Sequence, residues 1–135
     1  MAGSGIRYLS LAEVLALYSE LMERTGFVVA PLRNEGILES AVMRPQMAAH
    51  YGGADILRQA ALLAAGISQG QAFLDGNKRT AFGTMDTFLR LNGLRFNGRL
   101  KETVDQFAAL ATRADGLEAA TARFEQWLRA RVQPL

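Results

Sequence analysis

The sequence predicts an all-α protein, and three observations support this. Apolar residues recur at helical spacing along nearly the whole chain, and convincing period-two alternation is almost absent. Ser10 and Glu13 stand at the spacing of a capping box. The 135 residues are 50% hydrophobic and 21% charged, as expected of one domain that buries its own core. We therefore expect a single compact domain of about six helices over residues 1–135, with residues 1–6 as a disordered N-terminus.

The first helix should begin after Ser10 and follow one apolar face to Gly26. The stretch "FVVAPLRN" that comes next is typical of a connecting loop. A short helix should then run from Asn34 or Glu35 to about Arg44, because Pro45 interrupts the pattern.

The central helix should begin at Asp55, which follows the turn "HYGGAD" and can serve as its cap. Its alanines permit close packing by neighbouring helices, so we expect it to lie in the core. A further helix should end at the "NG" of residues 92 and 93. Two more are expected over about 102–113 and 117–131.

Composition excludes several classes of protein. The chain has no cysteine, so disulfides and thiolate metal sites are ruled out. No segment approaches the ~20 apolar residues of a membrane span, and we expect a soluble, cytoplasmic protein without a membrane partner. The 15 Lys and Arg are dispersed among 13 acids, and the densest group, "RFNGRLK" at 95–101, has one aromatic. Nucleic acid is therefore an unlikely partner.

The polar residues gather in "QAFLDGNKRTAF", residues 71–82, between two apolar stretches. This loop brings Asn77, Lys78 and Arg79 to the start of a helix, where unpaired N–H groups favour anions. Gly76 lets the backbone approach a ligand closely or take a positive φ, and Asn77 can cap the helix. The alternative is an ordinary turn with a cap and exposed cations.

Asp75 precedes this anion-binding segment and could hold a Mg²⁺ ion that bridges phosphate oxygens. A carboxylate beside two cations and a helix start is the combination that a nucleotide's phosphate groups require. The residues therefore point to a nucleotide's phosphate groups with their metal, but a stretch of this kind taken by itself is more often an ordinary capped turn, and the signal becomes specific only with its neighbours.

The stretch "AFLDGNKRTA" resembles the signature of the Fic and Doc family: His, any residue, Phe, two residues, Gly or Ala, Asn, Lys or Gly, Arg. Other segments, at 8–21, 32–46 and 88–96, are similar to the Doc branch, the death-on-curing toxins, and the resemblance covers about residues 7–130. It implies an all-helical Fic-type domain, in agreement with the periodicity. The matching residues in the signature are Phe73, Asp75, Gly76, Asn77, Lys78 and Arg79.

Lys78 points to the kinase branch, because adenylyl-transferring relatives usually have Gly there and a second Arg nearby, which this chain lacks. Adenylyl transfer is therefore the less favoured activity. The resemblance implies ATP and Mg²⁺ as cofactors and a protein hydroxyl of the translation machinery as substrate. It assigns Mg²⁺ to Asp75, the nucleotide to the loop with Phe73, Gly76 and Asn77, and both nucleotide binding and charge neutralisation to Lys78 and Arg79.

Gln71 occupies the position of the signature's His, the expected catalytic base. Imidazole accepts a proton near neutrality, whereas an amide does not titrate there. We therefore expect the rate of the catalysed reaction to be ~10²–10⁴-fold lower than with His at this position. Tyr18 also stands where Doc-like proteins often have His. The single histidine, His50, lies in a Gly-rich stretch and is expected at the surface, not as a relocated base.

Two functions stay open at this point. One is a toxin kinase attenuated or silenced at Gln71; the other is a non-catalytic module that binds nucleotide or an antitoxin. The inhibitory motif of many Fic enzymes, Ser or Thr followed four residues later by Glu and then Gly or Asn, does not occur at the "EG" of Glu35 and Gly36. We therefore expect control by a separate antitoxin protein.

Overall fold

The computed structural model describes residues 5–112 and 116–135, and within them the fold is all-α as predicted. None of the described helices is both long and apolar enough to cross a membrane. The elements in chain order are α1 (Leu11–Arg24), α2 (Glu35–Gly52), α3 (Ile56–Gly70), α4 (Asn77–Leu91), β1 (Leu94–Phe96), α5 (Leu100–Ala111), α6 (Gly116–Arg129) and β2 (Val132–Pro134).

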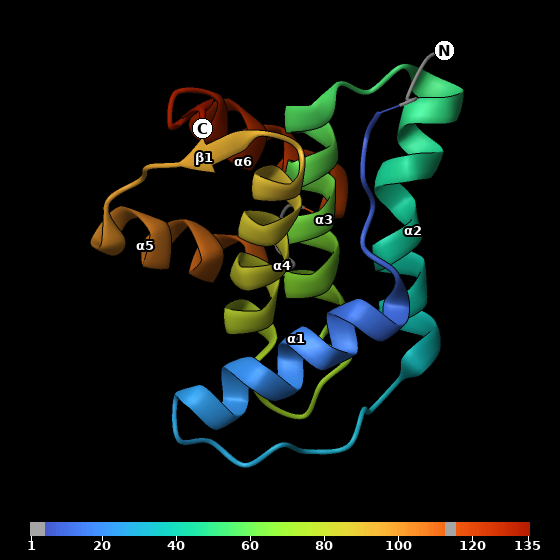
Figure 1. Ribbon diagram of the computed structural model, residues 1–135, viewed down its shortest axis with the longest axis vertical. Coiled ribbons are helices and arrows are strands. Elements are labelled where there is room, and N and C mark those ends of the chain that lie inside the picture. Colours follow the sequence, from blue (N-terminus) through green and yellow to red (C-terminus); the bar gives the residue numbers. More distant parts are fainter. Residues whose placement is uncertain (1–4, 113–115) are drawn as a thin grey trace.

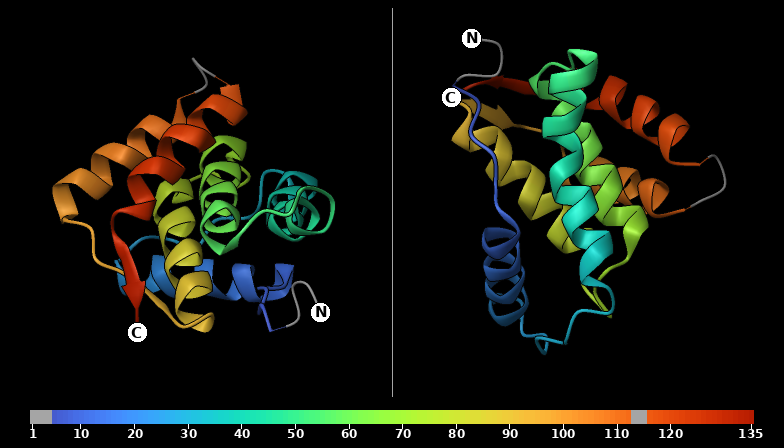
Figure 2. Two further views of the ribbon diagram at one scale, coloured as in Figure 1. Left: turned by 90° about the horizontal axis from the view of Figure 1, so that it is seen from above. Right: turned by 90° about the vertical axis from the view of Figure 1, so that its right-hand side faces the viewer.

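Helix α3 forms the centre of the molecule, with α2, α4, α5 and α6 packed around it (Figures 1 and 2). Every residue from Gln59 to Gln69 is buried. Small residues make this possible: a Cβ added at Gly66 would lie 3.1 Å from the Ala41 Cβ of α2. The expectation of a central, alanine-rich helix is confirmed.

The caps predicted for α1 and α3 are present. At the start of α1 the Glu13 N–H donates to Ser10 Oγ at 3.1 Å, and the Ser10 N–H donates to Glu13 Oε1 at 2.8 Å. At the start of α3 the Arg58 N–H donates to Asp55 Oδ1 at 2.9 Å. Both patterns are local in sequence, which is why they were predictable.

Helix α2 is longer than predicted, and the expected end at Arg44 is wrong. It continues through Pro45 to Gly52, where Gly53 adopts a left-handed conformation with φ 66°. A proline removes one N–H donor from a helix, but Pro45 is buried, and α2 packs along α3. Tertiary packing thus outweighs the local cost of the proline.

The chain after α4 differs from the expectation in a second way. β1 pairs antiparallel with β2, with Phe96 opposite Val132, so the stretch 95–101 is not a plain connection. The Phe96 ring lies 5.6 Å from that of Trp127. The last two helices, expected at about 102–113 and 117–131, are Leu100–Ala111 and Gly116–Arg129, and residue 113 lies outside the described residues.

At the N-terminal end, Ile6 is partly buried and packs against the hydrophobic core. The Arg7 N–H donates to Asn92 Oδ1 at 2.8 Å, and Asn92 Nδ2 donates back to the Arg7 carbonyl at 3.0 Å. The chain is therefore held from residue 6 onward. The rest of the segment expected to be disordered, residues 1–4, lies outside the described residues.

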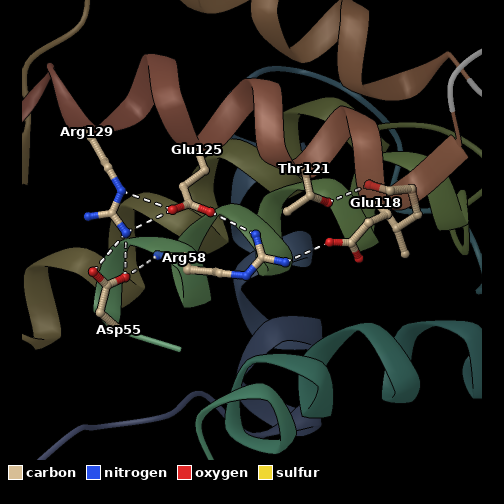
Figure 3. Close-up of polar contacts among 7 residues, drawn as sticks. Asp55, Arg58, Glu118, Thr121, Glu125 and Arg129 are labelled. Carbon is tan, nitrogen blue, oxygen red and sulfur yellow. Dashed lines mark hydrogen bonds and ion pairs between the residues drawn. The ribbon is translucent and has the colours of Figure 1, made fainter. Parts of the chain in front are cut away.

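A network of charged side chains joins α3 to α6 (Figure 3). Arg58 bridges Glu118 at 2.8 Å and Glu125 at 2.9 Å, and Arg129 bridges Asp55 and Glu125, both at 2.8 Å. Partial burial alone would raise the pKa of Asp55, but hydrogen bonds from the Arg58 N–H and the Arg129 guanidinium outweigh it and lower that pKa.

Candidate functional site

The loop between α3 and α4 is fastened from outside by the chain that leads into α2. The Arg33 and Asn34 N–H groups donate to the Ala72 carbonyl at 2.7 and 3.2 Å, and Leu32 forms an antiparallel bridge with Phe73. In Figure 1 this connection runs beneath α1 and past the α3–α4 loop. The loop therefore has partners on the backbone of a distant segment.

Phe73 anchors the loop in the core. Its side chain is fully buried and stacks on the Tyr18 ring of α1, with centroids 4.0 Å apart. The Tyr18 hydroxyl accepts from the Ala30 N–H at 3.0 Å and donates to the Ala30 carbonyl at 3.3 Å. Tyr18 thus connects α1, the loop and the segment before α2, as expected of a residue beside the site.

The Asn77 side chain closes the loop on itself. Its Oδ1 accepts from the Phe73 N–H at 3.0 Å, and its Nδ2 donates to the Phe73 carbonyl at 2.9 Å. The expectation that Asn77 caps α4 is wrong, because the N-cap residue is Gly76 and no side chain caps this helix. A second hydrogen on Nδ2 is still available to a ligand.

Gly76 is required at its position for two reasons. Its φ of 83° lies in the left-handed region, and an added Cβ would come 2.6 Å from the Met22 sulfur and 3.5 Å from Tyr18 Cε1. Beside it, Asp75 Oδ1 accepts from the Gly76 N–H at 2.8 Å, and the Asp75 side chain is exposed. A side chain at position 76 would therefore both strain the backbone and crowd Met22 of α1.

A cavity of about 290 Å³ opens at the amino end of α4. Of the site residues predicted from sequence, the structure brings all but the buried Phe73 to this cavity. Because no side chain caps α4, the N–H groups of its first turn are open to an anion. The lining residues are Ser68, Gln71, Leu74, Asp75, Gly76, Asn77, Lys78, Arg79 and Ala111.

Arg79 and Lys78 also line a second cavity, of about 620 Å³, between α4 and α5. Its apolar wall includes the rings of Phe82, Phe96 and Phe107. The Arg79 guanidinium lies 4.3 Å from the centroid of Phe27, a contact that holds the cation without cancelling its charge. The two cations thus stand between a polar cavity and an apolar one.

Gln71 has a backbone conformation that sequence reasoning missed. Among the described residues it is the one non-glycine residue with a positive φ, 50°, at the C-terminal cap of α3. Such caps are usually Gly or Asn, and a left-handed Gln carries strain, which is often found at functional positions. The one feature of the sequence that could have indicated this conformation is the position of Gln71 at the predicted end of a helix, just before the loop.

His50 lies far from this cavity. It is exposed in the last turn of α2 and stacks edge-on against Tyr51 at 4.5 Å. Because α2 begins beside the loop and rises ~1.5 Å per residue, His50 is ~20 Å or more away. The expectation of a surface residue is confirmed, and His50 cannot replace a base at position 71 in this conformation.

Asp75 fits a metal ion that arrives with a ligand. Within residues 5–112 and 116–135, no three His, Cys, Asp or Glu side chains gather closely enough to hold a metal by themselves. Mg²⁺ usually binds one or two carboxylates together with substrate phosphates, and retains water. A single exposed carboxylate next to an anion-binding helix start satisfies the protein's share of such a site.

Comparison with known proteins identifies the family of this chain. The model of the Fic/DOC family matches residues 8–89, which include α1, α2, α3, the loop and most of α4. The chain belongs to the Fic/Doc family. It is also 34% identical over 101 residues to Toxin Doc of Mycolicibacterium smegmatis (strain ATCC 700084 / mc(2)155), covering 69% of this chain and 77% of that protein.

The family assignment made from the "AFLDGNKRTA" stretch is confirmed, and so is the likeness to the Doc branch. Every residue that lines the cavity except Ala111 of α5 lies inside the matched residues, and α5 and α6 lie beyond them. The comparisons establish the family; the chemistry of the site must be argued from the residues.

Proposed function

We propose that this Fic/Doc protein is the toxin of a toxin–antitoxin pair that transfers phosphate from ATP to a protein hydroxyl of the translation machinery. The observation that carries the proposal is the cavity at the amino end of α4, where Asp75, Lys78 and Arg79 meet uncapped N–H groups. Likeness to Toxin Doc supports the toxin function. The Lys that follows Asn77 supports phosphate transfer over adenylyl transfer.

Each residue has a separate task in this proposal. The N–H groups of α4 and the Asn77 amide hold phosphate oxygens, and Lys78 and Arg79 offset the charge of the transferred group. Asp75 would hold a Mg²⁺ ion, which would supply further positive charge to offset that of the phosphates. Phosphoryl transfer relies mainly on positioning and electrostatic stabilisation, so this set of residues suffices for turnover.

Proton transfer is the weak point, because the Gln71 amide cannot accept a proton from a substrate hydroxyl near neutrality. It can still orient that hydroxyl by a hydrogen bond. We therefore propose a slow enzyme, whose rate of phosphate transfer is ~10²–10⁴-fold below that of an enzyme with a base at this position. The second candidate function is a module that binds ATP or an antitoxin without phosphate transfer. The single observation that favours it is the absence of a base at position 71.

The deciding experiment compares wild type with Gln71→His. His is among the residues that tolerate a positive φ, so the substitution suits the backbone found here. Transfer of labelled phosphate and of labelled AMP to lysate proteins, together with growth arrest on induction, is measured for both. We expect phosphate transfer to rise ~10²-fold or more in the variant. ATP binding without transfer in either protein would favour the non-catalytic module.

The antitoxin that we propose as partner should be an acidic, amphipathic segment. The apolar cavity between α4 and α5 suits such a segment, because Phe82, Phe96 and Phe107 form its wall and Lys78 and Arg79 its cationic rim. Leu100 and Val104 of α5, also at this cavity, are 81% and 58% exposed. A pull-down with the product of the adjacent reading frame tests this, and Val104→Glu should weaken the capture.

A further inference from the structure

Ser68, in the last turn of α3, carries a hydroxyl group without a hydrogen-bond partner. The residue is fully buried, and its Oγ has no partner among the described residues. Two other buried hydroxyls bond back to a carbonyl four residues earlier in the chain: Thr103 donates to Arg99 and Thr121 to Leu117, both at 2.7 Å. Ser68 makes no such bond, although this is the usual arrangement for a helical Ser or Thr.

A buried, unpaired hydroxyl costs free energy and calls for an explanation. Two other side chains share this state, Thr80 and Thr84 of α4. Only Ser68 of the three lines the cavity at the amino end of α4, together with Gln71 and the loop. The residue that carries this unpaired hydroxyl and the uncapped start of α4 thus border one cavity.

We propose that Ser68 is a ligand-contacting residue whose hydroxyl donates a hydrogen bond to the anion bound at the amino end of α4. On the function proposed above, from which the ligand's identity is taken, that anion is a phosphate group of ATP. A neutral hydroxyl adds a donor without adding charge, and a hydrogen bond to an anion is stronger than one between neutral groups. Ser68 therefore contributes to affinity from the α3 side, opposite the cations of α4.

The competing explanation is a buried water molecule that pairs with Ser68 and serves only the fold. The two explanations differ in what removal of the hydroxyl does. If the hydroxyl serves a ligand, Ser68→Ala keeps or raises the stability of the ligand-free protein, because an unsatisfied polar group leaves the core. If it serves the fold through water, the variant loses stability and keeps its affinity.

The experiment measures the affinity of wild type and Ser68→Ala for ATP–Mg²⁺ and for inorganic tripolyphosphate by calorimetry. We expect the variant to bind both probes roughly tenfold more weakly. The melting temperature of the ligand-free variant should equal or exceed that of wild type. Thr84→Val is the matched control, because it removes a buried, unpaired hydroxyl that does not line the cavity, and its affinity should be unchanged.

Equal affinity in wild type and Ser68→Ala would overturn the inference, and so would an equal loss in Thr84→Val, which would indicate a general effect of core substitutions. Absence of binding of both probes to wild type would overturn it as well. Failure of the proposed function looks different: tripolyphosphate and ATP would bind with the expected dependence on Ser68, while no phosphate would be transferred by wild type or by Gln71→His.

Discussion

Lys78 and Arg79 keep their charge available at the start of α4. No described residue forms an ion pair with either side chain, and the contacts of Arg79 are the Phe27 ring and the Met22 sulfur, the latter 3.6 Å from Nη1. Some other cations are neutralised locally, as in the pair of Lys101 with Asp105 at 3.4 Å. What distinguishes Lys78 and Arg79 is that they line a cavity at an uncapped helix start. The unpaired cations are the residue-level reason to expect anion binding.

The first prediction concerns these two cations. Replacing both Lys78 and Arg79 with Ala should weaken binding of ATP–Mg²⁺ about 100-fold or more, because each charge-assisted contact contributes ~1.5–3 kcal/mol. Calorimetric titration is the measurement. Arg24→Ala combined with Lys101→Ala removes the same net charge from exposed helical pairs and should change affinity little. Similar losses in the two double variants would indicate a long-range charge effect instead of a site.

Sequence reasoning at this scale identified residues but not their conformations. The signature-like stretch indicated Asp75, Lys78 and Arg79, and all three line one cavity. The left-handed backbone of Gln71 and the hydrogen bonds of Asn77 to Phe73 depend on the conformation of the loop. The same local sequence could adopt a different loop conformation in another fold. The unpaired hydroxyl of Ser68 was not predictable either, because it is defined by what lies around it.

At the scale of elements, the α3–α4 loop is held by the side chain of Asn77, so the second prediction addresses this connection. Asn77→Ala removes both hydrogen bonds to Phe73 and leaves a buried residue's N–H and carbonyl unpaired. We expect a loss of ~1–3 kcal/mol in the free energy of unfolding, measured with urea. Asn77→Asp keeps the acceptor and should lose less. An unchanged free energy of unfolding in Asn77→Ala would mean that the loop keeps its conformation without these hydrogen bonds.

Elements with local signals were predicted correctly, and elements that depend on distant residues were not. The capping box of Ser10 and the Asp55 cap are short patterns, and both helices begin where those patterns indicate. Pro45 was given too much weight, because burial against α3 sustains α2 beyond it. The β1–β2 pair joins Leu94–Phe96 to Val132–Pro134, and three-residue strands so far apart leave no periodic signal.

At the scale of the whole molecule, the charged network of Figure 3 attaches α6 to the start of α3, whereas the candidate site lies beyond the end of α3. Changes in this network should therefore alter stability and leave the site's geometry intact. The side chains of Asp55 and Arg129 are 55% and 41% exposed, so solvent screens their pair.

The third prediction follows from the lowered pKa of Asp55. A carboxyl with a depressed pKa in the folded state contributes stability above its ordinary value, and that contribution is lost as the pH falls through the depressed pKa. Asp55→Asn keeps a capping side chain but removes the charge. Near pH 7 we expect it to be ~0.2–1 kcal/mol less stable than wild type in urea unfolding, with the difference shrinking as the pH falls below the ordinary pKa of an aspartate and through the lowered pKa of Asp55.

Asp105→Asn is the reference for this comparison, because its pair with Lys101 is highly exposed. It should change stability less than Asp55→Asn near pH 7. A difference between wild type and Asp55→Asn that persists unchanged at acid pH would show that the charge of Asp55 is not its source.

Lys78 and Arg79 border both the polar cavity at the start of α4 and the apolar cavity beside α5. Occupants of the two cavities that pair with these cations draw on the same two charges, so their binding is thermodynamically linked. Linkage is reciprocal. If an acidic segment lowers the affinity for a nucleotide by some factor, the nucleotide lowers the affinity for that segment by the same factor. The concentration of nucleotide would then help to set how much of the protein is free of its partner.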